Sequence, residues 1–146
     1  MSEETQARQL VVFTLGDEHY ALPIQQVHEI IRYAQPRSVA SRADWVRGVI
    51  SLRGRIVPVY DLAAHLGVTS EISEQTKIVI VETESETAGV IVDDVEEVLT
   101  IEDEQIEEVP GADGALIESI AKVGDRLVIL LKPNAIFEDG GLAAAA

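Results

Sequence analysis

The chain has 146 residues, 47% of them hydrophobic, which is enough to bury one compact core or two small cores that pack together. It contains no cysteine, so disulfide bonds and thiolate metal sites are excluded, and no apolar run approaches the roughly 18 residues that span a bilayer. A formal net charge of −15 at pH 7 opposes contact with a phosphate backbone and so disfavours nucleic-acid binding.

The two ends of the chain carry no recognisable targeting signal. Residues 1–9 are polar and acidic and lack the basic and apolar parts of a secretory signal, so we expect a cytoplasmic protein without direct membrane insertion. The last residues contain Gly140 and Gly141 and end in four alanines. We expect residues 1–8 and 139–146 to be flexible tails around one module at 9–138.

The first elements are predicted to be a β-hairpin and a third strand. Apolar runs from Leu10 to Leu15 and from Tyr20 to Ile24 flank a polar turn at Gly16 to His19. The segment from Ile24 to Ile31 fits helical spacing as well as a strand. We favour a short turn that leads into a strand, because the segment is rich in β-branched residues and too short for a stable isolated helix.

A second hairpin and a short helix are predicted next. They follow in this order: a helical turn at Arg42–Arg47, a strand at Val49–Leu52, a tight turn at Arg53–Gly54, a strand at Ile56–Tyr60, and a helix at Asp61–Leu66 that Gly67 ends. The composition suits strands, because aromatic residues are scarce at 4% and the core must be filled by aliphatic side chains.

The second part of the chain repeats these signals. The run Val11-Val12-Phe13 recurs 68 residues later as Val79-Ile80-Val81, and the glycine turn at Gly54 recurs 70 residues later at Gly124. Two copies of one unit indicate a duplicated domain, because a solenoid needs three or more repeats. We therefore predict an all-β protein of two small barrels, with halves at about 9–70 and 71–138, and leave open whether strands are exchanged between them.

Charge is distributed unevenly between the two halves. No Lys or Arg lies between Lys77 and Lys122, whereas 14 acidic residues do. This acidic stretch is either a solvated face or a docking surface for a basic partner. The first half holds six of the 11 basic residues within a short stretch: Arg32, Arg37, Arg42, Arg47, Arg53 and Arg55.

The sequence offers no catalytic or metal-binding motif. His19, His28 and His65 lack metal-ligand spacing, and no nucleophile elbow, phosphate loop or dinucleotide fingerprint is present. Adjacent carboxylates such as Asp93 and Asp94 would point to opposite faces of a strand, so they do not form an acid/base pair. These observations favour a binding module without a cofactor over an enzyme.

Two charged residues lie in apolar surroundings. Glu29 is flanked by Val27 and Ile30, and Arg53 follows Leu52 at the predicted turn. A carboxylate and a guanidinium in such surroundings need partners, because an unpaired buried charge is costly. We hypothesise that Glu29 pairs with Arg53; the alternative is that both side chains face water.

Four stretches carry a family resemblance. They are Val12-Phe13-Thr14-Leu15-Gly16-Asp17-Glu18 with Tyr20-Ala21-Leu22-Pro23, Val27-His28-Glu29-Ile30, Gly48-Val49-Ile50-Ser51-Leu52-Arg53-Gly54-Arg55-Ile56-Val57-Pro58-Val59-Tyr60-Asp61-Leu62, and Gly89-Val90-Ile91-Val92-Asp93-Asp94-Val95. They resemble the CheW family of chemotaxis coupling proteins, and the resemblance covers about residues 9 to 138. The departures are Ser51, where the family often has Asn, and the absence of prolines at 39–43.

The resemblance implies two pseudo-symmetric five-stranded SH3-like barrels and a non-catalytic adaptor. Such an adaptor links chemoreceptor cytoplasmic tips to the regulatory domain of the histidine kinase CheA, at membrane-associated receptor arrays. The family's receptor contact maps onto Val27, Gly48 and Arg53, with Glu29 supporting Arg53. The kinase contact maps less sharply, onto Val98 and Leu99, which ordinary core packing explains equally well.

Two alternative functions remain open from the sequence. Within the family, the chain could couple a non-flagellar chemosensory array. From a different class, the many carboxylates allow an acidic β-barrel hydrolase, which would need a carboxyl with a raised pKa in a cleft.

Overall fold

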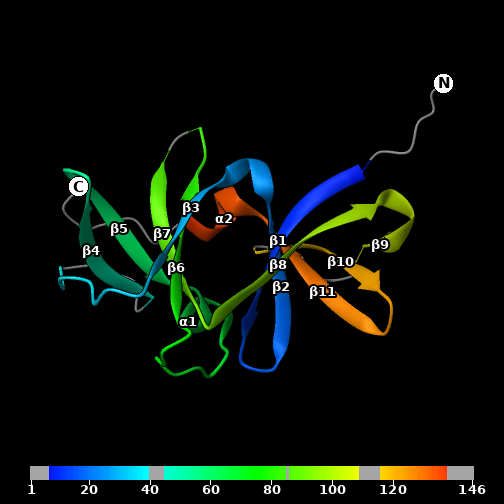
Figure 1. Ribbon diagram of the computed structural model, residues 1–146, viewed down its shortest axis with the longest axis horizontal. Coiled ribbons are helices and arrows are strands. Elements are labelled where there is room, and N and C mark those ends of the chain that lie inside the picture. Colours follow the sequence, from blue (N-terminus) through cyan, green and yellow to red (C-terminus); the bar gives the residue numbers. More distant parts are fainter. Residues whose placement is uncertain (1–6, 40–44, 85, 109–115, 138–146) are drawn as a thin grey trace.

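The computed structural model describes residues 7–39, 45–84, 86–108 and 116–137 (Figure 1). These residues form mainly strands, with two short helices and two 3-10 helices of three residues each among them. In chain order the elements are β1 (Ala7–Leu15), β2 (Glu18–Pro23), η1 (Ile24–Gln26), β3 (Val27–Arg32), β4 (Val46–Leu52), β5 (Arg55–Asp61), α1 (Leu62–Leu66), β6 (Lys77–Glu82), β7 (Thr87–Val92), β8 (Asp94–Glu102), η2 (Asp103–Gln105), β9 (Ile106–Glu107), β10 (Ile117–Val123), β11 (Arg126–Leu131) and α2 (Pro133–Phe137).

The strands form two sheets, each of which takes strands from both copies of the repeat. The first sheet has the order β8-β1-β2-β11-β10-β9 and the second has the order β3-β6-β7-β5-β4. The β1–β2 hairpin therefore lies beside β10–β11 of the second copy, and the β6–β7 hairpin lies beside β4–β5 of the first. The division of the sequence near residue 70 separates the repeats and does not separate the sheets.

The two sheets are pseudo-symmetric and confirm the predicted all-β fold with two SH3-like barrels. The first sheet forms the first barrel, and the second sheet forms the second barrel. Each contains one parallel contact at the equivalent place, β2 with β11 and β5 with β7. One prediction was incomplete, because the first sheet has six strands and not five. The additional strand is the two-residue β9, whose counterpart in the second sheet is a single bridge between Arg37 and Val49.

The local elements follow the sequence signals closely. The hairpins β1–β2 and β4–β5 form where predicted. The segment from Ile24 to Ile31 is a 3-10 turn that leads into strand β3, as we favoured. Asp61 begins helix α1 by accepting a hydrogen bond from the Ala64 N–H, and Gly67 ends it with φ 77°. The predicted helical turn at Arg42–Arg47 lies largely outside the described residues, and β4 begins at Val46, three residues earlier than expected.

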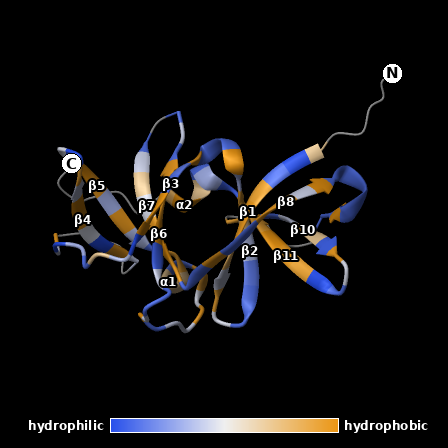
Figure 2. Cartoon of the chain, viewed as in Figure 1, coloured by the Kyte–Doolittle hydropathy of each residue, from blue (hydrophilic) through white to orange (hydrophobic). Residues whose placement is uncertain are grey.

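Both faces of the inner strands are buried, which explains their continuous apolar runs. Along β1, Leu10 and Val12 point into a core inside the first barrel, whereas Phe13 and Leu15 join a larger core between the barrels. A third core, inside the second barrel, contains Ile78 and its neighbours. Figure 2 shows the same pattern, with apolar colours along the inner strands and hydrophilic colours at the turns between strands.

Helices contribute little to the architecture. Helix α2 packs Ile136 and Phe137 into the core between the barrels, and the Phe137 ring meets Tyr60 edge-on at 5.4 Å. Within the described part of the chain, neither helix is long and apolar enough to cross a membrane.

Candidate functional site

The predicted contact between Glu29 and Arg53 is confirmed. Arg53 Nη1 donates to Glu29 Oε2 at 2.6 Å. Glu29 lies on β3 and Arg53 on the turn after β4, and these two strands are the opposite edges of the five-stranded sheet. The ion pair therefore joins the two ends of the sheet where the barrel closes, and we call it the closing pair.

The closing pair is asymmetric in its exposure. The Glu29 side chain is 21% exposed, whereas the Arg53 side chain is 69% exposed. The hydrogen bond from Arg53, together with its positive charge, holds the pKa of Glu29 below its usual value, and the same bond raises the pKa of Arg53. The pair is therefore charged at neutral pH, and the guanidinium remains accessible to a partner.

Arg53 also has a backbone conformation that side-chain-bearing residues rarely adopt. It is the one non-glycine residue with positive φ, at 51°, in the described part of the chain. With Gly54 at φ 83° it forms a two-residue turn with positive φ at both positions, for which Asn-Gly is the usual sequence. An observed outlier of this kind motivates a functional hypothesis for Arg53.

The other barrel contains an equivalent ion pair that sequence reasoning missed. Arg126 Nη2 donates to Glu97 Oε2 at 2.7 Å, and Arg126 Nη1 lies 3.3 Å from Glu96. Glu97 is the repeat of Glu29, so the repeat itself could have revealed this pair. Arg126 is the first residue after the β10–β11 turn, and in that turn Gly124 has the positive φ. The backbone of Arg126 therefore does not have the positive φ that Arg53 has. Barrel closure thus does not require an arginine in the strained position that Arg53 occupies.

The other two predicted receptor-contact residues differ in what they expose. Val27 is partly buried at the start of β3 and packs against the core between the barrels. Gly48 is buried in β4 at φ 143°, and a Cβ there would collide with the carbonyl oxygen of Arg37. Gly48 thus offers no side chain, and its role is to let the backbone at Arg37 approach β4.

The entry to β4 is fixed by contacts around Asp61. The Asp61 N–H donates to the Trp45 carbonyl at 2.6 Å, and the Asp61 carboxylate accepts from Arg47 Nη2 at 2.7 Å. The Trp45 ring stacks on His65 of α1, with ring centroids 4.0 Å apart. These contacts hold Arg47 at a fixed place beside Gly48.

The two predicted kinase-contact residues lie on β8, an edge strand of the first sheet. Val98 is 54% exposed, whereas Leu99 is partly buried and packs against the core inside the first barrel. Successive residues of a strand point to opposite faces, so the two side chains do not form one surface. Val98 alone of the two presents substantial apolar area to a partner.

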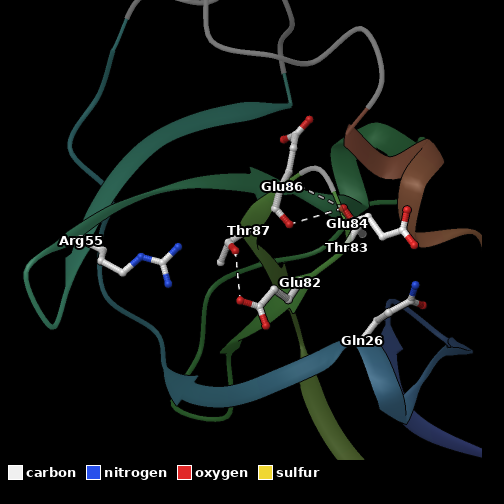
Figure 3. Close-up of a pocket in the computed structure, with 7 residues that line it drawn as sticks. All are labelled: Gln26, Arg55, Glu82, Thr83, Glu84, Glu86 and Thr87. Atoms are coloured by element: carbon white, nitrogen blue, oxygen red, sulfur yellow. Dashed lines mark hydrogen bonds between the residues drawn. The ribbon is translucent and has the colours of Figure 1, made fainter.

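A polar depression of about 570 Å³ lies between the β6–β7 turn, β5 and η1 (Figure 3). Its lining residues include Arg55 on β5 and three glutamates at and beside the β6–β7 turn, Glu82, Glu84 and Glu86. Thr87 Oγ1 donates to Glu82 Oε2 at 3.4 Å. Burial raises the pKa of Glu86, and burial together with Glu86 raises the pKa of Tyr60 to about 12.

The depression gives the hydrolase alternative limited support. It contains one carboxyl with a raised pKa, but no histidine is among its described lining residues. Among all the described residues, no group of three or more His, Cys, Asp or Glu side chains is placed to hold a metal ion. A partly buried carboxyl without a positioned base or nucleophile lacks the geometry of an acid-base catalyst.

Comparison with known proteins agrees with this geometry. The CheW-like domain family matches residues 9–140. The Chemotaxis protein CheW of Bacillus subtilis is 30% identical over 134 residues, which cover 88% of this chain and 86% of that protein. That of Klebsiella aerogenes is 36% identical over 81 residues, 56% of this chain, and the match spans 49% of that protein's length.

A solved structure shares the fold. The crystal structure of the scaffolding protein TtCheW from Thermoanaerobacter tengcongensis superposes with a TM-score of 0.85 at 36% identity, over 91% of this chain and 94% of that one. A more distant relative is the Protein PilI of Pseudomonas aeruginosa, 28% identical over 88 residues, which cover 60% of this chain and 49% of that protein. With a family match over nearly all of its length, the chain belongs to the CheW-like domain family, the coupling and scaffold proteins of chemotaxis.

Proposed function

We propose that this protein is a non-catalytic cytoplasmic adaptor that couples chemoreceptor cytoplasmic tips to the histidine kinase CheA. The observation that carries the proposal is the closing pair: an exposed arginine, held by Glu29 on a strained turn, in a protein of the CheW-like family. An adaptor acts by holding two partners in a fixed relation and by binding one kinase state better than another.

In this proposal the receptor contacts the side of the second barrel that carries the closing pair. Arg53 makes the direct contact, Glu29 orients it, and Val27 contributes apolar area from the start of β3. Gly48 acts indirectly, because its missing Cβ allows Arg37 to bridge to β4. An exposed guanidinium suits a carboxylate on the receptor, which it can bind through two parallel hydrogen bonds.

The regulatory domain of the kinase would dock on β8 through Val98, with Leu99 supporting the strand from inside the barrel. β8 also carries the acidic residues Glu96, Glu97 and Glu102. An apolar contact with a charged rim is typical of a non-obligate interface. Receptor and kinase would then occupy different sheets, which permits simultaneous binding.

A binding experiment with matched variants tests this function. Arg53→Glu should abolish co-elution with a receptor cytoplasmic fragment, whereas Arg126→Glu, the same change in the equivalent ion pair, should leave it intact. Val98→Asp should weaken binding to the kinase regulatory domain, with Ile30→Asp, its repeat equivalent at 41% exposure, as the control. Wild-type binding of both partners by Arg53→Glu and Val98→Asp would refute both sites.

A second candidate within the family is a coupling role in a non-flagellar array. The similarity to Protein PilI supports this candidate, because the chain is related to a protein that is not named CheW as well as to CheW proteins. The two candidates differ in partner and not in mechanism. Binding to the receptors and kinase of only one array would decide between them.

A further inference from the structure

The outer face of the β4–β5 hairpin carries an apolar strip that the core does not use. In the strand register Val49 lies opposite Pro58 and Ser51 lies opposite Ile56, and opposite residues share a face. Ile56 is 68% exposed, the largest value among the exposed large hydrophobic residues of the described chain. Val49 and Pro58 are half-buried beside it.

Basic side chains border this strip on its β4 side. Arg37 bridges directly to Val49 and is exposed, and Arg47 is the additional residue at the bulge between Val46 and Gly48. Arg47 is paired with Asp61, but in the described part of the chain Arg37 has no ion pair. In a protein of net charge −15, this is a locally basic edge.

The equivalent face of the other barrel keeps the apolar residue but reverses the charges. Leu127, next to the β10–β11 turn, is 51% exposed like Ile56. Glu107 bridges to β10 where Arg37 bridges to β4, and Glu118 is the bulge residue where Arg47 is. The duplication thus produced two faces with the same strand arrangement and with residues of opposite charge at two equivalent positions.

A second copy of this chain would be the simplest acidic partner, but its acidic face is already neutralised. Glu107 is paired with Lys122 at 3.0 Å, and Glu118 is paired with Arg8 at 2.8 Å. Two copies of a chain with net charge −15 also repel each other. These observations favour a different protein as the occupant.

We propose that the β4–β5 face docks an acidic segment of the receptor that carries an apolar stripe, with Ile56 as the apolar anchor and Arg37 as the selecting charge. The proposal rests on the proposed function, because Arg53 lies at the tip of the same hairpin and makes this face continuous with the receptor contact. A receptor that reaches Arg53 would extend along β4 toward Arg47 and Arg37.

The test is affinity for a receptor cytoplasmic fragment, measured at low and high salt with paired variants. Ile56→Ser and Arg37→Glu should each weaken binding about tenfold, because one loses a buried aliphatic side chain and the other places like charges together. Leu127→Ser and Glu107→Lys, the same positions in the other barrel, should bind like the wild type. The salt dependence should be smaller for Arg37→Glu than for the wild type.

The possible failures can be distinguished. Normal binding by Ile56→Ser and Arg37→Glu, with loss in Arg53→Glu, would overturn this inference and leave the proposed function standing. Absence of binding by the wild-type protein would overturn both. If the wild type self-associates in sedimentation and both Ile56→Ser and Leu127→Ser abolish this, the occupant is a second copy and the inference is wrong.

Discussion

At the scale of single residues, the informative feature is an arginine in a conformation that disfavours it. Arg53 holds φ 51° in a turn where Asn or Gly is the usual choice. In the other barrel Arg126 makes the corresponding ion pair from the first position after its turn, without this strain. The ion pair alone therefore does not explain why arginine occupies the turn. The proposed contact between its exposed guanidinium and the receptor gives a reason.

Replacing Arg53 with Asn tests this interpretation. Asn-Gly suits the turn, and the exposed ion pair that is lost contributes little, so Arg53→Asn should be at least as stable as the wild type in urea denaturation while losing receptor binding. Arg126→Asn removes an ion pair without relieving strain and should be slightly less stable than the wild type. Marked destabilisation by Arg53→Asn alone would mean that Arg53 is structural.

Glu29 gives a prediction about pH. Its pKa in the folded protein is lowered by Arg53 from an ordinary value of 4.5, so its contribution to stability is present above that value and is lost as the pH falls through the lower folded value. The difference in unfolding free energy between the wild type and Glu29→Gln should be constant near neutral pH and disappear in acid. Denaturant titrations between about pH 3 and pH 7 measure it; a difference that grows in acid would contradict the ion pair.

The sequence predicted part of this site, for identifiable reasons. The sequence predicts that Glu29 and Arg53 pair, because charged side chains in apolar surroundings need partners, and in the structure the two side chains are hydrogen-bonded. The strain at Arg53 was not predictable, because Arg-Gly is not a usual signal for this turn type. Gly48 matters through the backbone of Arg37, a non-local contact that no local pattern reveals.

At the scale of elements, β4 depends on a close backbone approach. The Arg37 N–H and carbonyl both bond to Val49, at 2.8 and 2.9 Å, and this bridge passes over Gly48. Gly54, in contrast, has open space around the position of a Cβ, although its φ of 83° is also positive. The two glycines therefore separate a steric requirement from a conformational one.

Alanine at each glycine measures this difference. Gly54→Ala should cost about 1 kcal/mol of unfolding free energy, from the backbone conformation alone. Gly48→Ala should cost about 2 kcal/mol or more, because the Arg37 bridge must also move. Urea denaturation of both variants provides the values, and equal costs would show that the close approach at Gly48 is not important for stability.

Hairpins and helix ends were predictable because their signals are local. Alternation, turn residues, the Asp61 cap and Gly67 each act within a few positions, and the structure reproduces them. The sequence does not predict which hairpins lie side by side, because a strand that is apolar on both faces does not indicate which strand is its neighbour. The repeat indicates two barrels, and only the three-dimensional structure assigns the strands to them.

At the scale of the whole molecule, the two copies of the repeat cannot be separated without dividing both sheets. Each sheet combines a hairpin of one copy with strands of the other, and a shared core that includes Phe13, Val81 and Leu131 fills the space between them. Neither copy alone could cover its apolar faces.

Fragments provide the test of this interdependence. Residues 1–70 and residues 71–146, expressed separately, should each be unfolded by NMR or circular dichroism, and mixing them should restore the folded spectrum because the sheets then regain all their strands. A well-dispersed spectrum from either fragment alone would show that the repeats fold independently.

In the proposed function the chain joins a receptor to a kinase through different barrels. Size-exclusion chromatography of the protein with a receptor cytoplasmic fragment and the CheA regulatory domain measures whether both partners bind at once. The wild type should give one ternary peak, whereas Arg53→Glu should lose the receptor and keep the kinase domain. No ternary peak for the wild type, or the same peak for Arg53→Glu, would contradict the proposed function.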